Sequence, residues 1–203
     1  MEVLVRVVVG NMKGGVGKST SAVYLACGLA RSGRTLLVDA DPQGSVLAWS
    51  EEAGVSFPAT VIAWPVRDLG RRLEQVAGDY EHLVVDTGPA QEQLLRQALA
   101  ATDHLLVPAA PSLMDVRELG RVLQMVDDLS PARKVAVHIL LTKVRAGTSS
   151  ARDARQGLTD QCLPVLAAQV SLREVYAQSW GTTPVGVGEY DQVLDELTSE
   201  LVR

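Results

Sequence analysis

Short apolar runs rich in β-branched residues alternate along the chain with longer stretches whose apolar residues recur at helical spacing. Near-continuous apolar runs are typical of strands buried on both faces of a sheet, and spacings of three and four residues are typical of amphipathic helices. We expect strands at 3–9, 35–40, 82–87, 104–109, 135–142 and 163–170, a weaker strand at 59–64, and helices at 18–32, 44–53, 67–77, 90–101, 113–129, 149–160, 171–180 and 189–202.

This alternation predicts a doubly wound α/β fold, in which helices cover both faces of a mostly parallel sheet. The 203-residue chain is long enough to bury one core, and no Pro/Gly/Ser-rich linker divides it, so we expect residues 1–203 to form a single domain. In such sheets ligands bind beyond the carboxyl ends of the strands. The residues that follow each strand are therefore the ones to examine.

The segment after the first strand, "GNMKGGVGKST" at 10–20, has the form of a phosphate-binding loop. In such loops glycines let backbone amides approach phosphates, a lysine (here Lys18) reaches the β- and γ-phosphates, and a hydroxyl (here Ser19) holds Mg²⁺. The loop departs from the usual pattern twice. Met12 stands where a glycine is usual, and Lys13 has no role in the ordinary loop.

Carboxylates follow two further strands. "VDADPQGS" places Asp39 and Asp41 at one strand end, and "LVVDTGP" places Asp86 at another. Helix capping or a turn would explain one of these segments but not both beside a phosphate-binding loop. Together the three segments predict a site for a nucleotide and magnesium.

At these motifs the chain resembles the ParA/MinD ATPases. "KGGVGKST" is similar to their deviant Walker A motif, which lacks the first glycine and carries an additional signature lysine where Lys13 stands. "LLVDADPQGS" and "LVVDTGPA" match the next two family motifs in order, "LLVPAAPSLMDV" resembles the segment that follows, and "VYAQSWGTTPV" resembles a late segment of the small ParF-like and Soj-like partition ATPases. The resemblance covers nearly the whole chain and implies a P-loop NTPase fold of the deviant Walker A type.

The resemblance also implies roles for single residues. Lys13 would cross a two-fold interface to the ATP of a partner subunit, Lys18 would bind the phosphates, and Asp41 would orient the attacking water. Ser19 would ligate Mg²⁺ directly, with Asp39 and Asp86 supporting the ion through its waters. Thr20 and the amides of Gly14, Gly15, Val16 and Gly17 would complete the phosphate cradle; Thr142, Lys143 and Pro184 are candidates for contact with the adenine, where an ordinary surface turn is the alternative.

The formal net charge of −5 conceals an asymmetry. Residues 133–173 carry seven basic residues against two acidic ones, a local charge of +5, so the remainder carries −10. A basic surface on an acidic protein favours a polyanionic partner, although a solvated face is an equal alternative. The candidates for contact with DNA are Arg145, Arg152, Arg155 and Arg173.

The implied function is a partition-type ATPase that dimerises on ATP, binds DNA non-specifically, and positions a plasmid, a chromosome or a protein compartment. A ParB-like or other cargo-adaptor protein would stimulate hydrolysis, and the protein would be cytoplasmic and associated with the nucleoid. The chain starts directly on the first strand, so we expect no N-terminal helix-turn-helix extension and no sequence-specific operator binding.

Three other functions share this fold. A MinD-like membrane ATPase needs a basic amphipathic helix near the end of the chain, but residues 189–203 carry five acidic residues against Arg203 alone, so we expect no membrane partner. A nitrogenase-iron-protein-like ATPase needs cluster cysteines, which Cys162 alone cannot supply. For a small-molecule ligase of the dethiobiotin-synthetase kind, Lys13 within "KGGVGKST" favours the partition branch instead.

Overall fold

A computed structural model describes residues 4–129 and 133–199 of the chain. The strands are β1 (Val5–Val9), β2 (Thr35–Asp39), β3 (Thr60–Ala63), β4 (His82–Asp86), β5 (His104–Ala109), β6 (Ala136–Val144) and β7 (Val165–Ser171). The helices are α1 (Lys18–Leu29), α2 (Ser45–Ala53), the 3-10 helix η1 (Gly54–Ser56), α3 (Leu69–Val76), α4 (Glu92–Ala101), α5 (Leu113–Leu129), α6 (Ser149–Asp160), α7 (Glu174–Gln178) and α8 (Tyr190–Ser199).

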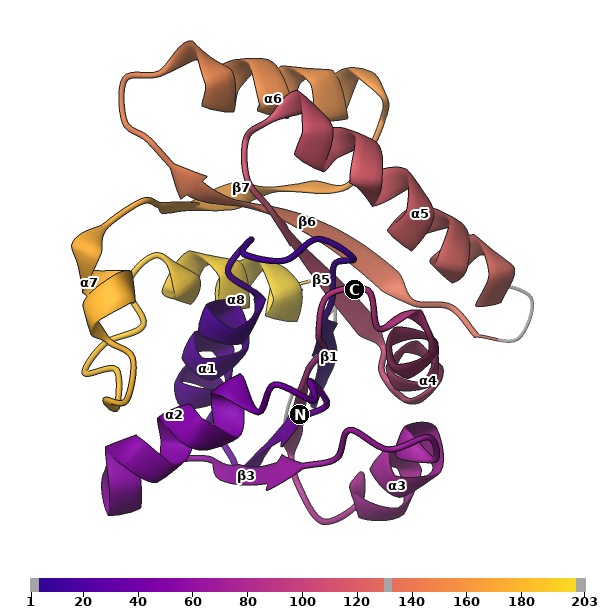
Figure 1. Ribbon diagram of the computed structural model, residues 1–203, viewed down its shortest axis with the longest axis vertical. Coiled ribbons are helices and arrows are strands. Elements are labelled where there is room, and N and C mark those ends of the chain that lie inside the picture. Colours follow the sequence, from indigo (N-terminus) through magenta and orange to yellow (C-terminus); the bar gives the residue numbers. More distant parts are fainter. Residues whose placement is uncertain (1–3, 130–132, 200–203) are drawn as a thin grey trace.

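The described strands form one sheet in the order β3-β2-β4-β1-β5-β6-β7, and each of these pairings is parallel. The central strand β1 pairs with β4 through Val5 and His82, and with β5 through Val7 and His104 (Figure 1). Because the strands run in one direction, the residues that follow them meet at one edge. The predicted fold class is confirmed.

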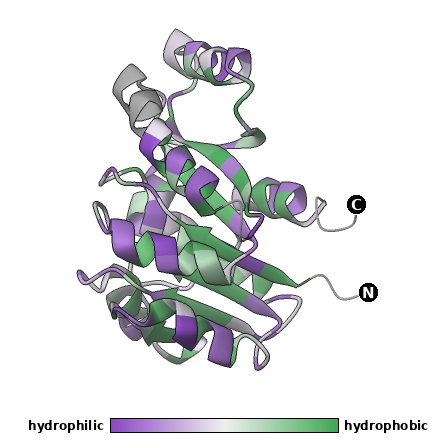
Figure 2. Ribbon diagram, turned by 90° about the vertical axis from the view of Figure 1, so that its right-hand side faces the viewer, coloured by the Kyte–Doolittle hydropathy of each residue, from purple (hydrophilic) through white to green (hydrophobic). Residues whose placement is uncertain are grey.

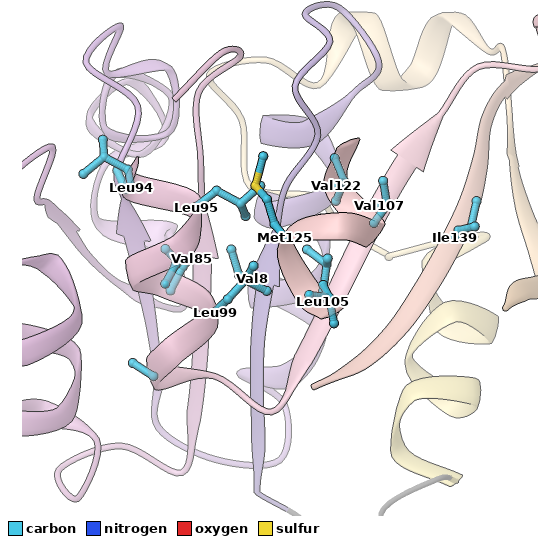
Figure 3. Packing of buried hydrophobic residues seen from close by; sticks show 14 of the residues in the cluster. Val8, Val85, Leu94, Leu95, Leu99, Leu105, Val107, Val122, Met125 and Ile139 are labelled. Atoms are coloured by element: carbon cyan, nitrogen blue, oxygen red, sulfur yellow. The ribbon is translucent and has the colours of Figure 1, made fainter. Parts of the chain in front are cut away.

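Two apolar layers lie on opposite faces of the sheet. Val8 of β1 belongs to the layer under α3, α4, α5 and α6, whereas Val7 and Val9 belong to the layer under α1, α2 and α8. Figure 3 shows the first layer, where Leu95 and Met125 approach the strands. Hydrophobic strands between helices with hydrophilic outer sides are visible in Figure 2. The strands are thus fixed on both faces, and their carboxyl ends are positioned by the core.

The predicted elements agree with the structure except near one segment. The strand candidate at 59–64 is present as β3, and the helix expected at 149–160 is α6. The helix expected at 171–180 is wrong in extent: β7 continues to Ser171, and α7 spans five residues. The reason is that Ser171 still pairs with Val144 of β6. Part of the helix expected at 189–202 lies outside the described residues.

Candidate functional site

The P-loop, residues 10–20, links β1 to the first turn of α1 at the carboxyl edge of the sheet. Gly15 and Gly17 have φ of 73° and 88°, a backbone conformation that side chains disfavour, which is why glycine is needed there. Gly17 caps α1 without a side-chain hydrogen bond, and the first turn of α1 has no acidic residue. The amides of that turn point toward the space in front of the loop, where the helix dipole favours an anion.

Two side chains hold the P-loop to neighbouring strands. Buried Asn11 donates from Nδ2 to the carbonyl oxygen of Pro108 at 2.8 Å, and its Oδ1 accepts from the amide of Lys13 at 3.0 Å. On the other side, Thr142 Oγ1 donates to the carbonyl oxygen of Val16 at 2.8 Å. The ends of β5 and β6 therefore fix the shape of the loop.

The two lysines of the loop occupy different positions. The side chain of Lys18 is buried, and its Nζ donates to the carbonyl oxygen of Lys13 at 2.8 Å. Burial lowers the pKa of Lys18, while the charges of Asp86 and Asp41 oppose that shift. Lys18 lines the cavity in front of the loop, whereas Lys13 is not among its lining residues.

Asp86 lies fully buried at the end of β4, beside the first turn of α1. Ser19 Oγ donates to Asp86 Oδ2 at 2.7 Å, and Asp86 Oδ1 has no hydrogen-bond partner among the residues described. Burial raises the pKa of Asp86 to about 7, with the hydrogen bond from Ser19 acting in the opposite direction. A buried acceptor without a partner next to a hydroxyl is what a nearby cation with its water shell would satisfy.

Asp39 anchors the start of α2. Its Oδ1 accepts from the amide of Asp41 at 3.1 Å, and its Oδ2 accepts from the amides of Val46 and Leu47, each at 2.9 Å. Burial raises the pKa of Asp39 above its ordinary value, and these backbone hydrogen bonds oppose that shift. The carboxylate thus has a capping role at a helix N-terminus, and its proposed support of a metal through water would be additional.

Asp41 follows Asp39 and faces the cavity with its side chain largely enclosed. A Cβ built on Gly88 would lie 2.6 Å from Asp41 Oδ1, closer than side chains normally approach. The backbone at Gly88 therefore packs directly against the carboxylate of Asp41. Only glycine leaves room for it there.

The residues present fit Mg²⁺ bound together with phosphates. Within the described ranges, no group of three or more His, Cys, Asp or Glu side chains is arranged to hold a metal ion. Mg²⁺ commonly takes one or two protein oxygens and completes its shell with phosphate oxygens and water. Ser19 can supply the direct oxygen and Asp86 the support for a bound water.

The main cavity has a volume of about 520 Å³ and extends from the P-loop to the ends of β6 and β7. This volume is in the usual range for small-molecule sites. Opposite the P-loop it is bounded by a surface that we call the β7–α7 wall, formed by Val170, Ser171, Leu172, Arg173, Tyr176 and Ala177. The other lining residues are Gly14, Gly15, Gly17, Lys18, Ser19, Thr20, Asp41, Gln43, Ser45, Pro89, Thr142, Lys143 and Tyr190.

The three residues expected near an adenine have different positions. Thr142 and Lys143 line the main cavity, and Lys143 has a φ of 55°, which is uncommon for a residue with a side chain. Pro184 is not among the lining residues. Its loop is held against α2 and η1, because Trp49 Nε1 donates to the carbonyl oxygen of Thr182 at 2.8 Å and Thr183 Oγ1 lies 2.8 Å from Ser56 Oγ.

The structure separates the four arginines expected at a DNA surface. Arg145, Arg152 and Arg155 line a second cavity of about 320 Å³ between the end of β6 and α6, whereas Arg173 lies in the β7–α7 wall. The guanidinium of Arg155 donates to the carbonyl oxygens of Leu166 and Ala167. Arg155 therefore ties α6 to β7 in addition to contributing charge.

The contacts among several residues around the main cavity carry no signal in the sequence. Tyr24, Tyr176 and Tyr190 pack together with ring centroids 5.0–5.8 Å apart, and Tyr190 Oη lies 2.9 Å from Ser21 Oγ of α1. Glu189 accepts hydrogen bonds from Ser171 and Tyr176 of the β7–α7 wall but does not itself line the cavity. Tyr24 lies far along the chain from Tyr176, Glu189 and Tyr190, and no motif spacing connects it with them.

A family model described as "CobQ/CobB/MinD/ParA nucleotide binding domain" matches residues 7–179. A "Maintenance of carboxysome distribution protein A" from Gloeobacter kilaueensis is 35% identical over 164 residues, which cover 80% of this chain and 74% of the relative.

Solved structures share the fold. A putative plasmid partition protein from Borrelia burgdorferi bound to AMPPNP has a TM-score of 0.79 at 18% identity, over 96% of this chain and 98% of that one. Cobyrinic acid a,c-diamide synthase from Mycobacterium smegmatis, with a bound ATP analog and magnesium, has a TM-score of 0.76 at 23% identity, over 98% and 95%. With a P-loop carrying two lysines, carboxylates at the next strand ends and a family model matching most of its length, this chain belongs to the CobQ/CobB/MinD/ParA family of nucleotide-binding domains.

Proposed function

We propose that the chain is a ParA-type partition ATPase that binds ATP and Mg²⁺ in the main cavity and hydrolyses ATP slowly. The observation that carries this proposal is that the two lysines of the P-loop occupy different positions. Lys18 lines the cavity, whereas Lys13 is not among its lining residues and has its backbone amide held by Asn11. A lysine in that position suits an ATP bound to a second subunit.

The chain's own residues supply the steps of hydrolysis. Lys18 and the amides of the P-loop bind the β- and γ-phosphates, and Ser19 and Asp86 would hold Mg²⁺, which would supply positive charge beside the phosphates. Asp41 accepts a hydrogen bond from the attacking water and orients it. Asp41→Ala should retain ATP while turnover falls by roughly a hundredfold or more. Normal turnover in this variant would remove Asp41 from the mechanism.

Dimerisation tests the role of Lys13. Since its proposed contact exists only across a two-fold interface, Lys13→Ala should leave ADP affinity of the monomer intact and weaken ATP-dependent dimerisation measured by light scattering. Lys134→Ala is the matched control, because exposed Lys134 lies just before β6, at the opposite edge of the sheet. If Lys13→Ala dimerises like the parent with ATP and magnesium, the cross-subunit role is wrong.

We further propose that the ATP dimer binds DNA without sequence preference through the second cavity. Arg145 and Arg152 are exposed there beside the N-terminus of α6, and a two-fold dimer doubles this basic surface. Each neutralised phosphate should contribute about −0.9 to the slope of log affinity against log salt. Because Arg155 also holds β7, Arg145→Glu with Arg152→Glu is a cleaner test than a variant of Arg155.

Fluorescence anisotropy on random-sequence duplexes at two salt concentrations measures this binding. The charge-reversed pair should weaken binding with ATP and magnesium and leave ATP affinity unchanged. Exposed Arg31 and Arg34 lie after α1 at the other edge of the sheet, so Arg31→Glu with Arg34→Glu is the charge-matched control. If the parent binds no duplex under any nucleotide condition, the DNA-dependent reading is wrong.

A MinD-like membrane function receives less support from α8. This helix packs into the core through Val193 and Leu197, and Glu196 accepts hydrogen bonds from the amides of Ala167 and Ala168 of β7. It is therefore an integral part of the fold. Among the described helices, none has both the length and the apolar character needed to cross a membrane.

The cargo is proposed from the relatives. One is described as maintaining carboxysome distribution and another as a putative plasmid partition protein, so a protein compartment or a plasmid is the class of cargo that we propose. A cargo-adaptor protein would then stimulate turnover. Comparing the turnover of the DNA-bound ATPase with and without the protein encoded by each adjacent gene tests this step. No stimulation by any of these proteins would contradict it.

A further inference from the structure

Glu189, just before α8, accepts hydrogen bonds from residues of the β7–α7 wall. Its Oε2 accepts from the Ser171 amide and the Tyr176 hydroxyl, each at 2.9 Å, and its Oε1 accepts from Ser171 Oγ at 2.7 Å. Arg173 Nη2 lies 3.3 Å from Oε1. One carboxylate thus connects the end of β7, the following loop and α7 to α8.

On its α7 side the wall is supported by contacts of Tyr176 with Tyr24, Tyr190 and Glu189. This helix has five residues, none of which is buried, and a helix of that length is not stable by itself. Its position therefore depends on contacts such as the hydrogen bond from Tyr176 to Glu189 and the edge contact of Tyr176 with Tyr24. Loss of the carboxylate should let the wall move.

The surroundings favour an ionised Glu189. Although burial opposes ionisation, the hydrogen bonds from Ser171 and Tyr176 and the charge of Arg173 lower the pKa of Glu189 below its ordinary value. Its side chain is 19% exposed, so these charge-assisted hydrogen bonds are partly shielded from water. The preceding Gly188, with a φ of 57°, lets the chain pass close to the Tyr176 hydroxyl, which lies 3.4 Å from where a Cβ would stand.

The phosphates of a nucleotide are confined to the P-loop end of the main cavity, so its nucleoside must lie toward the β7–α7 wall. We infer that Glu189 is a positioning residue that holds this wall in place and thereby sets affinity for the nucleoside part of ATP. Glu189 acts through Ser171, Arg173 and Tyr176, which line the cavity, and is not itself among the lining residues. This inference rests on the proposed binding of ATP.

Titration calorimetry with two ligands tests it, namely ATP and inorganic triphosphate, each with magnesium. Glu189→Ala should weaken ATP binding by roughly tenfold or more and leave triphosphate binding within about twofold, because the P-loop is unchanged. Glu189→Gln retains an acceptor oxygen and should show a smaller loss. Tyr176→Phe removes a single hydrogen bond and should lose a few-fold in ATP affinity.

Glu196→Ala is the matched control. Glu196 lies on α8, the helix that Glu189 immediately precedes, and accepts hydrogen bonds from two amides of the same strand β7, but away from the main cavity. Glu196→Ala should lower the melting temperature without changing the affinity for ATP relative to that for triphosphate. ATP affinity equal to the parent's in Glu189→Ala, equal losses for both ligands, or the same loss in Glu196→Ala would each overturn the inference. A parent that binds neither ligand would instead overturn the proposed function on which it rests.

Discussion

At one end the main cavity is bounded by the backbone of a single short loop, and at the other by side chains from three separate elements. The P-loop takes its shape from glycines at 15 and 17 and from the start of α1. The β7–α7 wall takes its shape from Glu189 and the tyrosine cluster. Backbone amides bind any phosphate, so we expect the loop end to set the class of ligand and the wall to set which nucleoside is accepted.

The largest expected effect concerns the P-loop end. Lys18→Ala removes the buried ammonium that faces the phosphates, so affinity for both ATP and inorganic triphosphate should fall by roughly a hundredfold or more. Glu189→Ala, in contrast, should weaken the binding of ATP but not that of triphosphate. Calorimetry with both ligands measures it. A loss confined to ATP would contradict the division between the two ends.

A smaller effect is expected where the P-loop end meets Asp41. The Cβ of Gly88→Ala would press on the Asp41 carboxylate, and displacement of a catalytic group by about 1 Å costs up to roughly a hundredfold in rate. Turnover should fall while ATP affinity stays within a few-fold. Gly78→Ala is the control, since nothing lies within 4 Å of its Cβ. Parent-like turnover in Gly88→Ala would show that Asp41 tolerates the displacement.

A pH effect should arise away from both ends. His138 Nε2 lies 3.0 Å from His104 Nδ1 on neighbouring strands. Burial, with a smaller contribution from His104, lowers the pKa of His138 to about 4 from its ordinary value of 6.5. Between these values the unfolded chain binds a proton that the folded chain does not. The stability that neutral, buried His138 contributes is therefore complete above pH 6.5 and is lost progressively as the pH drops toward 4.

Denaturant titrations at several pH values measure this effect. From pH 7 to pH 5 the free energy of unfolding should fall by about 2 kcal/mol through His138. In His138→Gln this part of the slope should disappear, while the contribution of His82, whose pKa burial also lowers, remains. An unchanged slope in the variant would assign the acid sensitivity to other groups.

The smallest expected effect concerns the hydrogen bond by which β6 holds the P-loop. Thr142→Val keeps the shape of the side chain but removes the hydroxyl that donates to the carbonyl oxygen of Val16. A hydrogen bond of this kind contributes about 1 kcal/mol, so affinity for ATP and triphosphate should fall several-fold together. Thr142→Ser retains the hydroxyl and should bind like the parent. Equal binding by both variants would show that β6 does not hold the loop.

The sequence predicts the P-loop end well because its determinants are local. Glycine at positive φ, the lysine and the hydroxyl follow one another within "GGVGKS", and the strand-end aspartates are marked by the apolar runs before them. The contacts that form the β7–α7 wall were not predicted, although Tyr176 lies within the segment "VYAQSWGTTPV" that resembles the partition ATPases. These contacts join Tyr24, Tyr176 and Glu189, which come together only through packing. The helix expected at 171–180 was too long for the same reason, because pairing with β6 keeps Ser171 in the sheet.

The central place of β1 has a consequence for synthesis of the chain. This strand is made before its partners β4 and β5, and Val5 and His82 are 77 residues apart. At about 5–20 residues per second, the ribosome needs roughly 4–15 seconds to bridge that interval. During this time the apolar segment Val5–Val9 has no sheet to join, so a nascent chain is exposed to aggregation until β4 emerges. Nucleotide binding should therefore begin only after β4 and β5 have been made and have given the P-loop its shape.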